Sequence, residues 1–130
     1  MEDIGKEAQV SPYKGKTGLR RICAAFFHSL EGFRSAFRHE DAFRQEVMLA
    51  VVLVPAALFM PVAGLGKALM VASVLLVLIV ELINSAVEAT VDRISLEQHQ
   101  LAKRAKDIGS AAVFVSLVNV AAVWGLVLLG

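Results

Sequence analysis

Uninterrupted apolar stretches dominate the pattern of the chain. The three longest stretches without a charged residue occupy residues 47–66, 68–80 and 108–130. A helix needs about 20 apolar residues to cross the hydrocarbon core of a bilayer. The first and third stretches therefore predict transmembrane helices, at about 44–63 and 108–129. The middle stretch is too short unless the helix continues past Glu81, so we expect the second span at about 67–92.

The segment ahead of these spans has an amphipathic pattern instead. Its large apolar residues recur at intervals of three and four positions, as on one face of a helix; they are Leu19, Ile22, Phe26, Leu30, Phe33 and Phe37. Arginine, histidine and glutamate occupy the opposite face. A basic amphipathic helix with aromatic residues is typical of one that lies along a membrane surface, although packing on another helix of the protein would produce the same pattern. We expect this surface helix at 19–38, after a flexible tail at 1–18.

These elements predict an all-α membrane protein with one domain, residues 19–130, that has an amphipathic surface helix and three transmembrane helices. Composition agrees, because 57% of the residues are hydrophobic, more than in an ordinary soluble domain. The single cysteine, Cys23, excludes an internal disulfide. Gly15-Lys16-Thr17 lacks the glycine that a phosphate-binding P-loop requires five positions upstream, so this class of nucleotide site is excluded.

Basic residues are distributed unevenly around the predicted spans. Of the 13 lysine and arginine residues, eight precede residue 47, one (Lys67) lies between the first two spans, four lie between 93 and 106, and none follows residue 108. Cytoplasmic segments of membrane proteins carry the excess of positive charge. We therefore expect the N-terminus and the loop at 92–107 in the cytoplasm, and the C-terminus on the opposite side of the membrane.

A stripe of polar residues enters the second predicted span. At about 100° per residue, five side chains fall within about 100° of arc on one helix face; they are Glu81, Asn84, Ser85, Glu88 and Asp92. An ionisable residue inside a membrane helix costs roughly 2.5–3.5 kcal/mol on insertion scales and usually marks function. Glu81 is therefore a candidate general base for the proton of an alcohol. A structural glutamate that hydrogen-bonds between helices would explain this residue equally well.

Carboxylates and cations gather on the side of the membrane predicted to be cytoplasmic. Glu88 and Asp92 continue the stripe toward that surface, and the topology places Glu40 at a similar depth. Carboxylate oxygens suit Mg²⁺, which keeps substrate phosphates among its ligands. With the nearby cations Lys103, Arg104 and Lys106, the set indicates phosphoryl transfer, which depends on positioning and charge stabilisation. Such cations can equally serve topology or bind anionic lipids.

Three blocks of the sequence resemble a known family. Glu81-Leu-Ile-Asn-Ser-Ala-Val-Glu88-Ala-Thr-Val-Asp92-Arg93-Ile, followed by Ala105-Lys106-Asp107-Ile-Gly109-Ser110-Ala111-Ala112, closely resembles the signature of the prokaryotic diacylglycerol kinases. Glu40-Asp-Ala-Phe43-Arg44-Gln45-Glu46 is similar to the segment that leads into the family's first span. The resemblance covers roughly 19–124. It implies a homotrimer in the bacterial inner membrane, with active sites between subunits, that transfers the γ-phosphate of MgATP to diacylglycerol and makes phosphatidic acid.

The resemblance also implies roles for individual residues. Glu81 would be the general base, supported by Asn84, and Glu40 and Glu88 would hold Mg²⁺. The implied nucleotide contacts are Arg21, His28, Glu40, Glu88, Glu97, Gln98, His99, Lys106 and Asp107. The implied lipid contacts are Arg21, Arg34, Phe43, Arg44, Gln45, Glu46, Glu81 and Ser110. His28 stands where many members carry Tyr, and Asp41 adds a carboxylate where a small residue is common, so the effects of these two departures stay open.

Two other functions also fit the sequence. Related chains of the family phosphorylate undecaprenol by the same chemistry, and the sequence does not define the apolar walls that would select the lipid. A small ion or proton channel, a different class, would be lined by the polar stripe in an oligomer, but it would need neither Lys106 and Asp107 nor Glu40. The expected partners are MgATP, a lipid alcohol, membrane lipids and further copies of the chain, with no nucleic acid.

Overall fold

A computed structural model of the protein describes residues 17–94 and 100–130. This part of the chain forms four α-helices: α2 (Leu19–His39), α3 (Asp41–Phe59), α4 (Gly64–Ile94) and α5 (Gln100–Leu129). By length and composition, α3, α4 and α5 can each cross a membrane, so the chain is a multi-pass membrane protein. The predicted all-α class and the three predicted spans are thereby confirmed. The predicted tail lies almost wholly outside the described residues.

The ends of the long helices differ from the predicted limits for identifiable reasons. The helix α3 ends at Phe59 rather than near residue 63, and Met60 after it is extended (φ −68°, ψ 144°). Met60 precedes Pro61, and a residue before proline is disfavoured in the helical region. The helix α5 begins at Gln100, well before residue 108, because backbone hydrogen bonding continues into polar sequence where the apolar stretch does not.

The chain divides into two compact units, Met1–Ser35 and Ala36–Gly130, and the division falls within α2. In the first unit, Gly18 precedes α2 with a φ of 61°, a left-handed conformation that glycine adopts without steric cost. Large apolar side chains of the predicted stripe are exposed along this part of α2, namely Leu19, Ile22, Phe26, Leu30 and Phe33. The helix is confirmed, and its place on a membrane surface stays a prediction.

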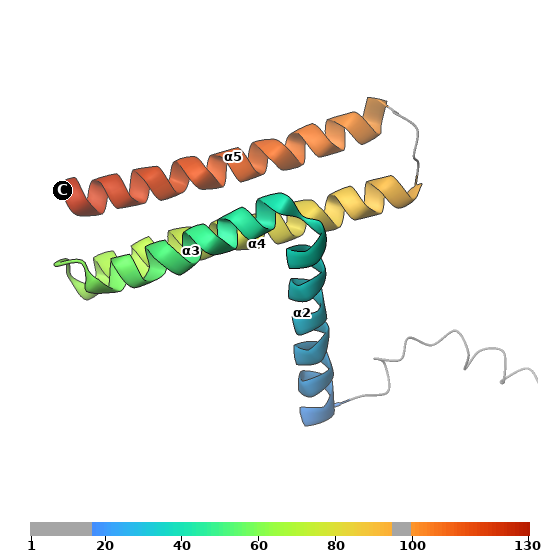
Figure 1. The fold of residues 1–130 in the computed structure, drawn as a ribbon, viewed down its shortest axis with the longest axis horizontal. Helices are drawn as coiled ribbons and strands as arrows, with labels where there is room; N and C mark the ends of the chain where they lie inside the picture. Colours follow the sequence, from blue (N-terminus) through green and yellow to red (C-terminus); the bar gives the residue numbers. More distant parts are fainter. Residues whose placement is uncertain (1–16, 95–99) are drawn as a thin grey trace, which may run out of the picture. The chain divides into compact units, whose positions relative to one another are not determined.

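In the second unit, α4 is the central helix, because both α3 and α5 pack against it (Figure 1). The pair α4 and α5 is antiparallel. Near one end, the Trp124 Nε1 donates a hydrogen bond to the Met70 carbonyl oxygen at 3.3 Å. Near the other end, the Lys106 Nζ lies 2.7 Å from the Asp92 Oδ1. These contacts define the register in which α5 faces α4.

Most of the buried apolar residues of the core belong to α3 and α4. The buried residues of α3 are Phe43, Ala50 and Ala57, which are spaced by seven positions and so follow one line along the helix. Small side chains such as Ala50 and Ala57 allow close approach between membrane helices. On α4 the buried side chains pass from apolar residues such as Met70 and Val77 to the polar residues of the stripe. The packing therefore continues without interruption into the polar face.

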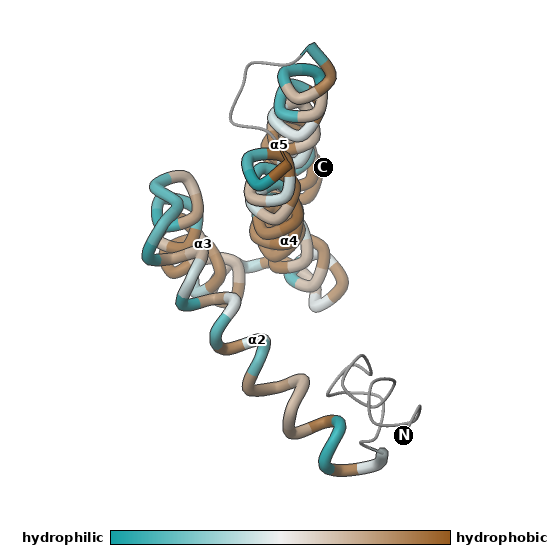
Figure 2. Tube along the Cα trace, turned by 90° about the vertical axis from the view of Figure 1, so that its right-hand side faces the viewer, coloured by the Kyte–Doolittle hydropathy of each residue, from teal (hydrophilic) through white to brown (hydrophobic). Residues whose placement is uncertain are grey.

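Hydrophilic residues gather at one end of the three long helices. Figure 2 looks along these helices and shows hydrophilic turns at the near ends of α3, α4 and α5, with hydrophobic residues behind them. This end contains the start of α3, the end of α4 and the start of α5. A membrane protein places such an end at the level of the lipid headgroups, so a site here would meet both water and lipid.

Candidate active site at the polar end of the long helices

The polar stripe of α4 becomes steadily less buried toward the end of the helix. Glu81, Asn84 and Ser85 are only 4%, 8% and 9% exposed. Glu88, further along, is half-buried, and Asp92 is exposed. The stripe therefore leads from a carboxylate inside the packed helices to carboxylates that water and solutes can reach.

The helix α3 brings two more glutamates to this stripe. Glu40 immediately precedes α3 in an extended conformation (φ −118°, ψ 109°), and Glu46 lies in the second turn of the helix. The charges of Glu88 and Glu40 both act on Glu81, and the charge of Glu81 acts on Glu46. We call Glu40, Glu46, Glu81 and Glu88 the carboxylate cluster. Like charges this close repel one another, and protons or cations relieve that repulsion.

Three buried polar atoms at this place have no hydrogen-bond partner within the described parts of the chain. They are the Glu46 Oε2, the Asn84 Oδ1 and the Ser85 Oγ. A buried polar group left unpaired costs about 1–3 kcal/mol. These atoms lie on α3 and α4, as the carboxylate cluster does. A concentration of unpaired polar groups is typical of a site that binds a polar ligand.

The chemistry of the carboxylate cluster is compatible with Mg²⁺. No three His, Cys, Asp or Glu side chains within 17–94 and 100–130 form a group that could hold a metal ion by themselves. However, Mg²⁺ is usually held by one or two carboxylates together with substrate phosphates. The half-buried Glu40 and Glu88 supply ligands of this kind. The residues therefore fit an ion that arrives with a phosphate-bearing substrate.

Arg44 closes the corner between α2 and α3 next to Glu40. Its Nη1 donates hydrogen bonds to the carbonyl oxygens of Phe37, at 2.7 Å, and Arg38, at 3.0 Å. Its Nη2 forms an ion pair with Asp41. The last carbonyls of a helix lack intrahelical partners and carry partial negative charge. The guanidinium gives two of these carbonyl oxygens a hydrogen bond and a positive charge. Asp41 is the counterion of this arginine.

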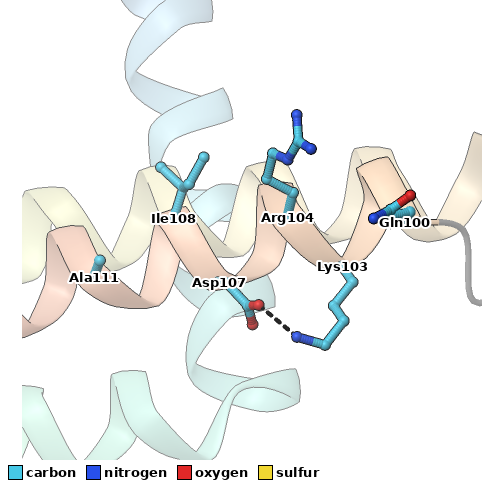
Figure 3. A pocket seen from close by; sticks show the side chains of 6 residues that line it. All are labelled: Gln100, Lys103, Arg104, Asp107, Ile108 and Ala111. Carbon is cyan, nitrogen blue, oxygen red and sulfur yellow. Dashed lines mark hydrogen bonds and ion pairs between the residues drawn. The ribbon is translucent and has the colours of Figure 1, made fainter.

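The two lysines of α5 already have anionic partners. Lys106 pairs with Asp92 of α4, and the charge of Glu88 also acts on Lys106. The Lys103 Nζ lies 2.8 Å from the Asp107 Oδ2. This second pair and Arg104 line a shallow hollow on α5, together with Gln100, Ile108 and Ala111 (Figure 3). Lys106 is thus held at the edge of the carboxylate cluster by a residue of another helix.

The remaining residues implied by the resemblance fall into three groups. Arg21, His28 and Arg34 are exposed on α2 in the first unit, where the His28 Nδ1 lies 4.0 Å from the Glu31 Oε2. Phe43 is buried in the α3–α4 core, whereas Gln45 and Ser110 are exposed on α3 and α5. Glu97, Gln98 and His99 lie outside the described residues.

Two relationships at the site were not recognised from the sequence. Glu46 was assigned only to the lipid, yet it lies close enough to Glu81 for their charges to interact. Lys106 and Asp92 were identified separately, and their pairing was not foreseen. Both relationships depend on how two helices are aligned along their axes. The periodic pattern of residues in a single helix does not reveal that alignment.

Comparison with known proteins places the chain among characterised families. The family model for prokaryotic diacylglycerol kinase matches residues 27–128. A diacylglycerol kinase of Pseudomonas aeruginosa is 58% identical over 120 residues, which cover 92% of this chain and 98% of that protein. Diacylglycerol kinases of Haemophilus influenzae and Escherichia coli are 50% and 44% identical, over 84% and 86% of this chain and 92% of each relative. The family match begins within α2 and covers the carboxylate cluster and nearly all of the three long helices, and the chain belongs to the prokaryotic diacylglycerol kinase family.

Proposed function

We propose that the protein is an ATP-dependent diacylglycerol kinase of the bacterial inner membrane. The observation that carries this proposal is the carboxylate cluster, with the buried Glu81 at its inner end, on membrane helices whose polar end also carries Lys106. The bacterial relatives named diacylglycerol kinase support the same activity. Its substrates are then ATP and diacylglycerol, and its products are ADP and phosphatidic acid.

The proposed reaction assigns a defined task to Glu81. Its carboxylate accepts the proton of the lipid hydroxyl, whose oxygen forms a bond to the γ-phosphorus. The bond between this phosphorus and the oxygen bridging to the β-phosphorus breaks, and ADP leaves with the electron pair. The proton then passes from Glu81 to the solvent. The position of Glu81 at the inner end of the stripe supports this task, because a lipid hydroxyl approaches from the membrane.

The other residues of the site bind and orient the nucleotide. Glu40 and Glu88 would hold Mg²⁺, which when bound neutralises negative charge on the phosphate oxygens. Lys106 and Asp107 would contact the nucleotide, and the Asp92 ion pair keeps the Lys106 ammonium group at the edge of the cluster before the nucleotide arrives. Asn84, one turn from Glu81, would support the base.

We further propose that the protein is a homotrimer with active sites between subunits, and that the N-terminus and the loop between α4 and α5 are cytoplasmic. The family resemblance supports the trimer. Large apolar side chains exposed on the long helices, such as Met48, Val52 and Phe114, also require lipid or another subunit to cover them. The distribution of lysine and arginine supports the orientation.

The activity is tested by transfer of labelled γ-phosphate from ATP to lipid in mixed micelles with Mg²⁺. Diacylglycerol and undecaprenol are offered in parallel. Labelled phosphatidic acid as the main product is the expected result. If undecaprenyl phosphate is labelled instead, the proposed mechanism holds but the lipid acceptor is undecaprenol. If a folded trimer labels neither lipid, the proposed kinase activity is wrong, and channel activity is measured next.

Glu81→Gln removes the proposed base while preserving the size of the side chain. We expect phosphoryl transfer to fall by about 10²- to 10⁴-fold, the usual contribution of a general base. ATP binding, measured by equilibrium titration, should persist. Glu31→Gln, which changes an exposed glutamate on α2, is the matched control and should retain full activity. Near-normal turnover of Glu81→Gln would rule out the assignment of the base.

Glu88→Gln removes one of the two proposed metal ligands. The Mg²⁺ concentration needed for half-maximal activity and the KM for ATP should rise together, because one carboxylate fewer holds the ion that accompanies the nucleotide. The measurement is a titration of activity with Mg²⁺ at several ATP concentrations. Loss of the trimer in detergent would instead assign Glu88 a structural role.

Cys23 provides a test of orientation without any substitution. It is the single cysteine of the chain and is exposed on α2. A membrane-impermeant thiol reagent should label it in inverted inner-membrane vesicles and not in intact spheroplasts, since we expect α2 on the cytoplasmic side. Labelling in both spheroplasts and detergent, but not in inverted vesicles, would reverse the proposed topology.

A further inference from the structure

Gly109 of α5 lies directly against the side chain of Asn84 on α4. A Cβ atom at position 109 would collide with the Asn84 Oδ1 and lie 3.1 Å from the Asn84 Cγ. The carboxamide therefore occupies the space that any side chain at position 109 would require. This is a contact between one helix backbone and one polar side chain of the site.

The contact determines which way the carboxamide is turned. Asn84 is 8% exposed, and its Oδ1 has no hydrogen-bond partner in the described parts of the chain. This oxygen is the atom closest to the place where a Cβ of Gly109 would stand. Cα–H groups donate weak hydrogen bonds at helix interfaces, worth about 0.5–1 kcal/mol each. With its oxygen turned toward α5, the carboxamide directs its amino group away from Gly109.

Asn84 also lies on the same face of α4 as Glu81. The two residues are three positions apart, so their side chains are neighbours on the helix surface, and both are buried. The carboxamide therefore contacts α5 and lies next to the candidate base on the surface of α4. A change in its orientation would alter the polar groups around Glu81 without altering Glu81 itself.

We propose that Gly109 is a positioning residue of the reaction, which holds the Asn84 carboxamide in its productive orientation because it has no side chain. The proposal rests on the proposed function in one respect, that Asn84 and Glu81 take part in phosphoryl transfer. Gly109 itself touches no reacting atom in this account. It acts only through Asn84.

A substitution at Gly109 should leave the fold intact. The atom in the way is the far end of a flexible side chain, so Asn84 can rotate while α5 keeps its place. Alanine also favours a helix more than glycine does, by about 1 kcal/mol. Gly109→Ala should therefore produce a folded protein in which the carboxamide alone is displaced.

The chain offers two matched controls for this substitution. Gly66 lies at the other end of the same helix pair, where a Cβ would approach the Val127 Cγ1 to 2.9 Å. Gly125 lies on α5, and a Cβ there would meet nothing within 4 Å. Gly66→Ala thus adds a methyl group to the same interface against an apolar side chain, and Gly125→Ala adds it to open space on the same helix.

The first measurement compares kcat and KM of the three alanine variants in the full-length protein. Displacement of a group at a reacting centre by about 1 Å can cost about 10²-fold in rate, so kcat of Gly109→Ala should fall by about 10- to 100-fold. The KM for ATP should stay within about twofold of its original value, because only the interaction at the reacting centre is lost. Both controls should keep their kcat. Equal losses in Gly66→Ala and Gly109→Ala would overturn the proposal.

A double-mutant cycle separates a positioning role from a packing role. If Gly109 acts through Asn84, Gly109→Ala should have no further effect on kcat in a protein that already carries Asn84→Ala. An unchanged loss in that background would assign Gly109 to helix packing alone.

The amide ¹⁵N–¹H signal of the Asn84 side chain gives a readout that needs no activity. It should shift in Gly109→Ala and stay in place in Gly66→Ala, in protein without substrates. An unshifted signal in Gly109→Ala overturns the inference whatever the activity. If the unaltered protein makes no labelled lipid, the proposed function fails, while a shifted signal would still establish that Gly109 positions the carboxamide.

Discussion

The structure depends on the burial of Glu81 in a helix that is otherwise apolar. A carboxylate in a low-dielectric interior is strongly disfavoured as a charge unless protons, cations or hydrogen bonds compensate it. The carboxylates of α3 and α4 that converge on Glu81 increase this cost, because like charges repel one another, and Lys106 of α5 lies at the edge of the cluster. The packing of the long helices therefore concentrates negative charge around this one unfavourable group, and protons or the cations that accompany a substrate can relieve it.

The sequence predicted the membrane helices well because their existence depends on the length of apolar sequence alone. Their ends were predicted less well. The start of α5 at Gln100 depends on backbone hydrogen bonds that continue through polar residues. The end of α3 depends on the conformation that Pro61 imposes on Met60. Apolar content records neither effect.

The candidate site likewise has features that the sequence predicted and features that it did not. The polar face of α4 was readable because Glu81, Asn84 and Ser85 recur with the period of one helix, and all three are buried. The approach of Glu46 to Glu81, the pairing of Lys106 with Asp92, and the contact of Gly109 with Asn84 each join two helices. Such contacts follow from the relative shift of two helices along their axes. A difference of one turn would remove all of them while leaving the pattern of each helix unchanged.

The ion pairs on α5 have a consequence for how a nucleotide is exchanged. Lys106 and Lys103 each already form an ion pair with a carboxylate before any nucleotide binds. Under the proposed function, a triphosphate that reaches Lys106 substitutes for Asp92, and the departing ADP returns the lysine to that carboxylate. The exchange of one anion for another contributes to the binding free energy only the difference between the two electrostatic attractions. Binding of this kind is moderate in strength, weakens as salt screens the phosphates, and releases product readily.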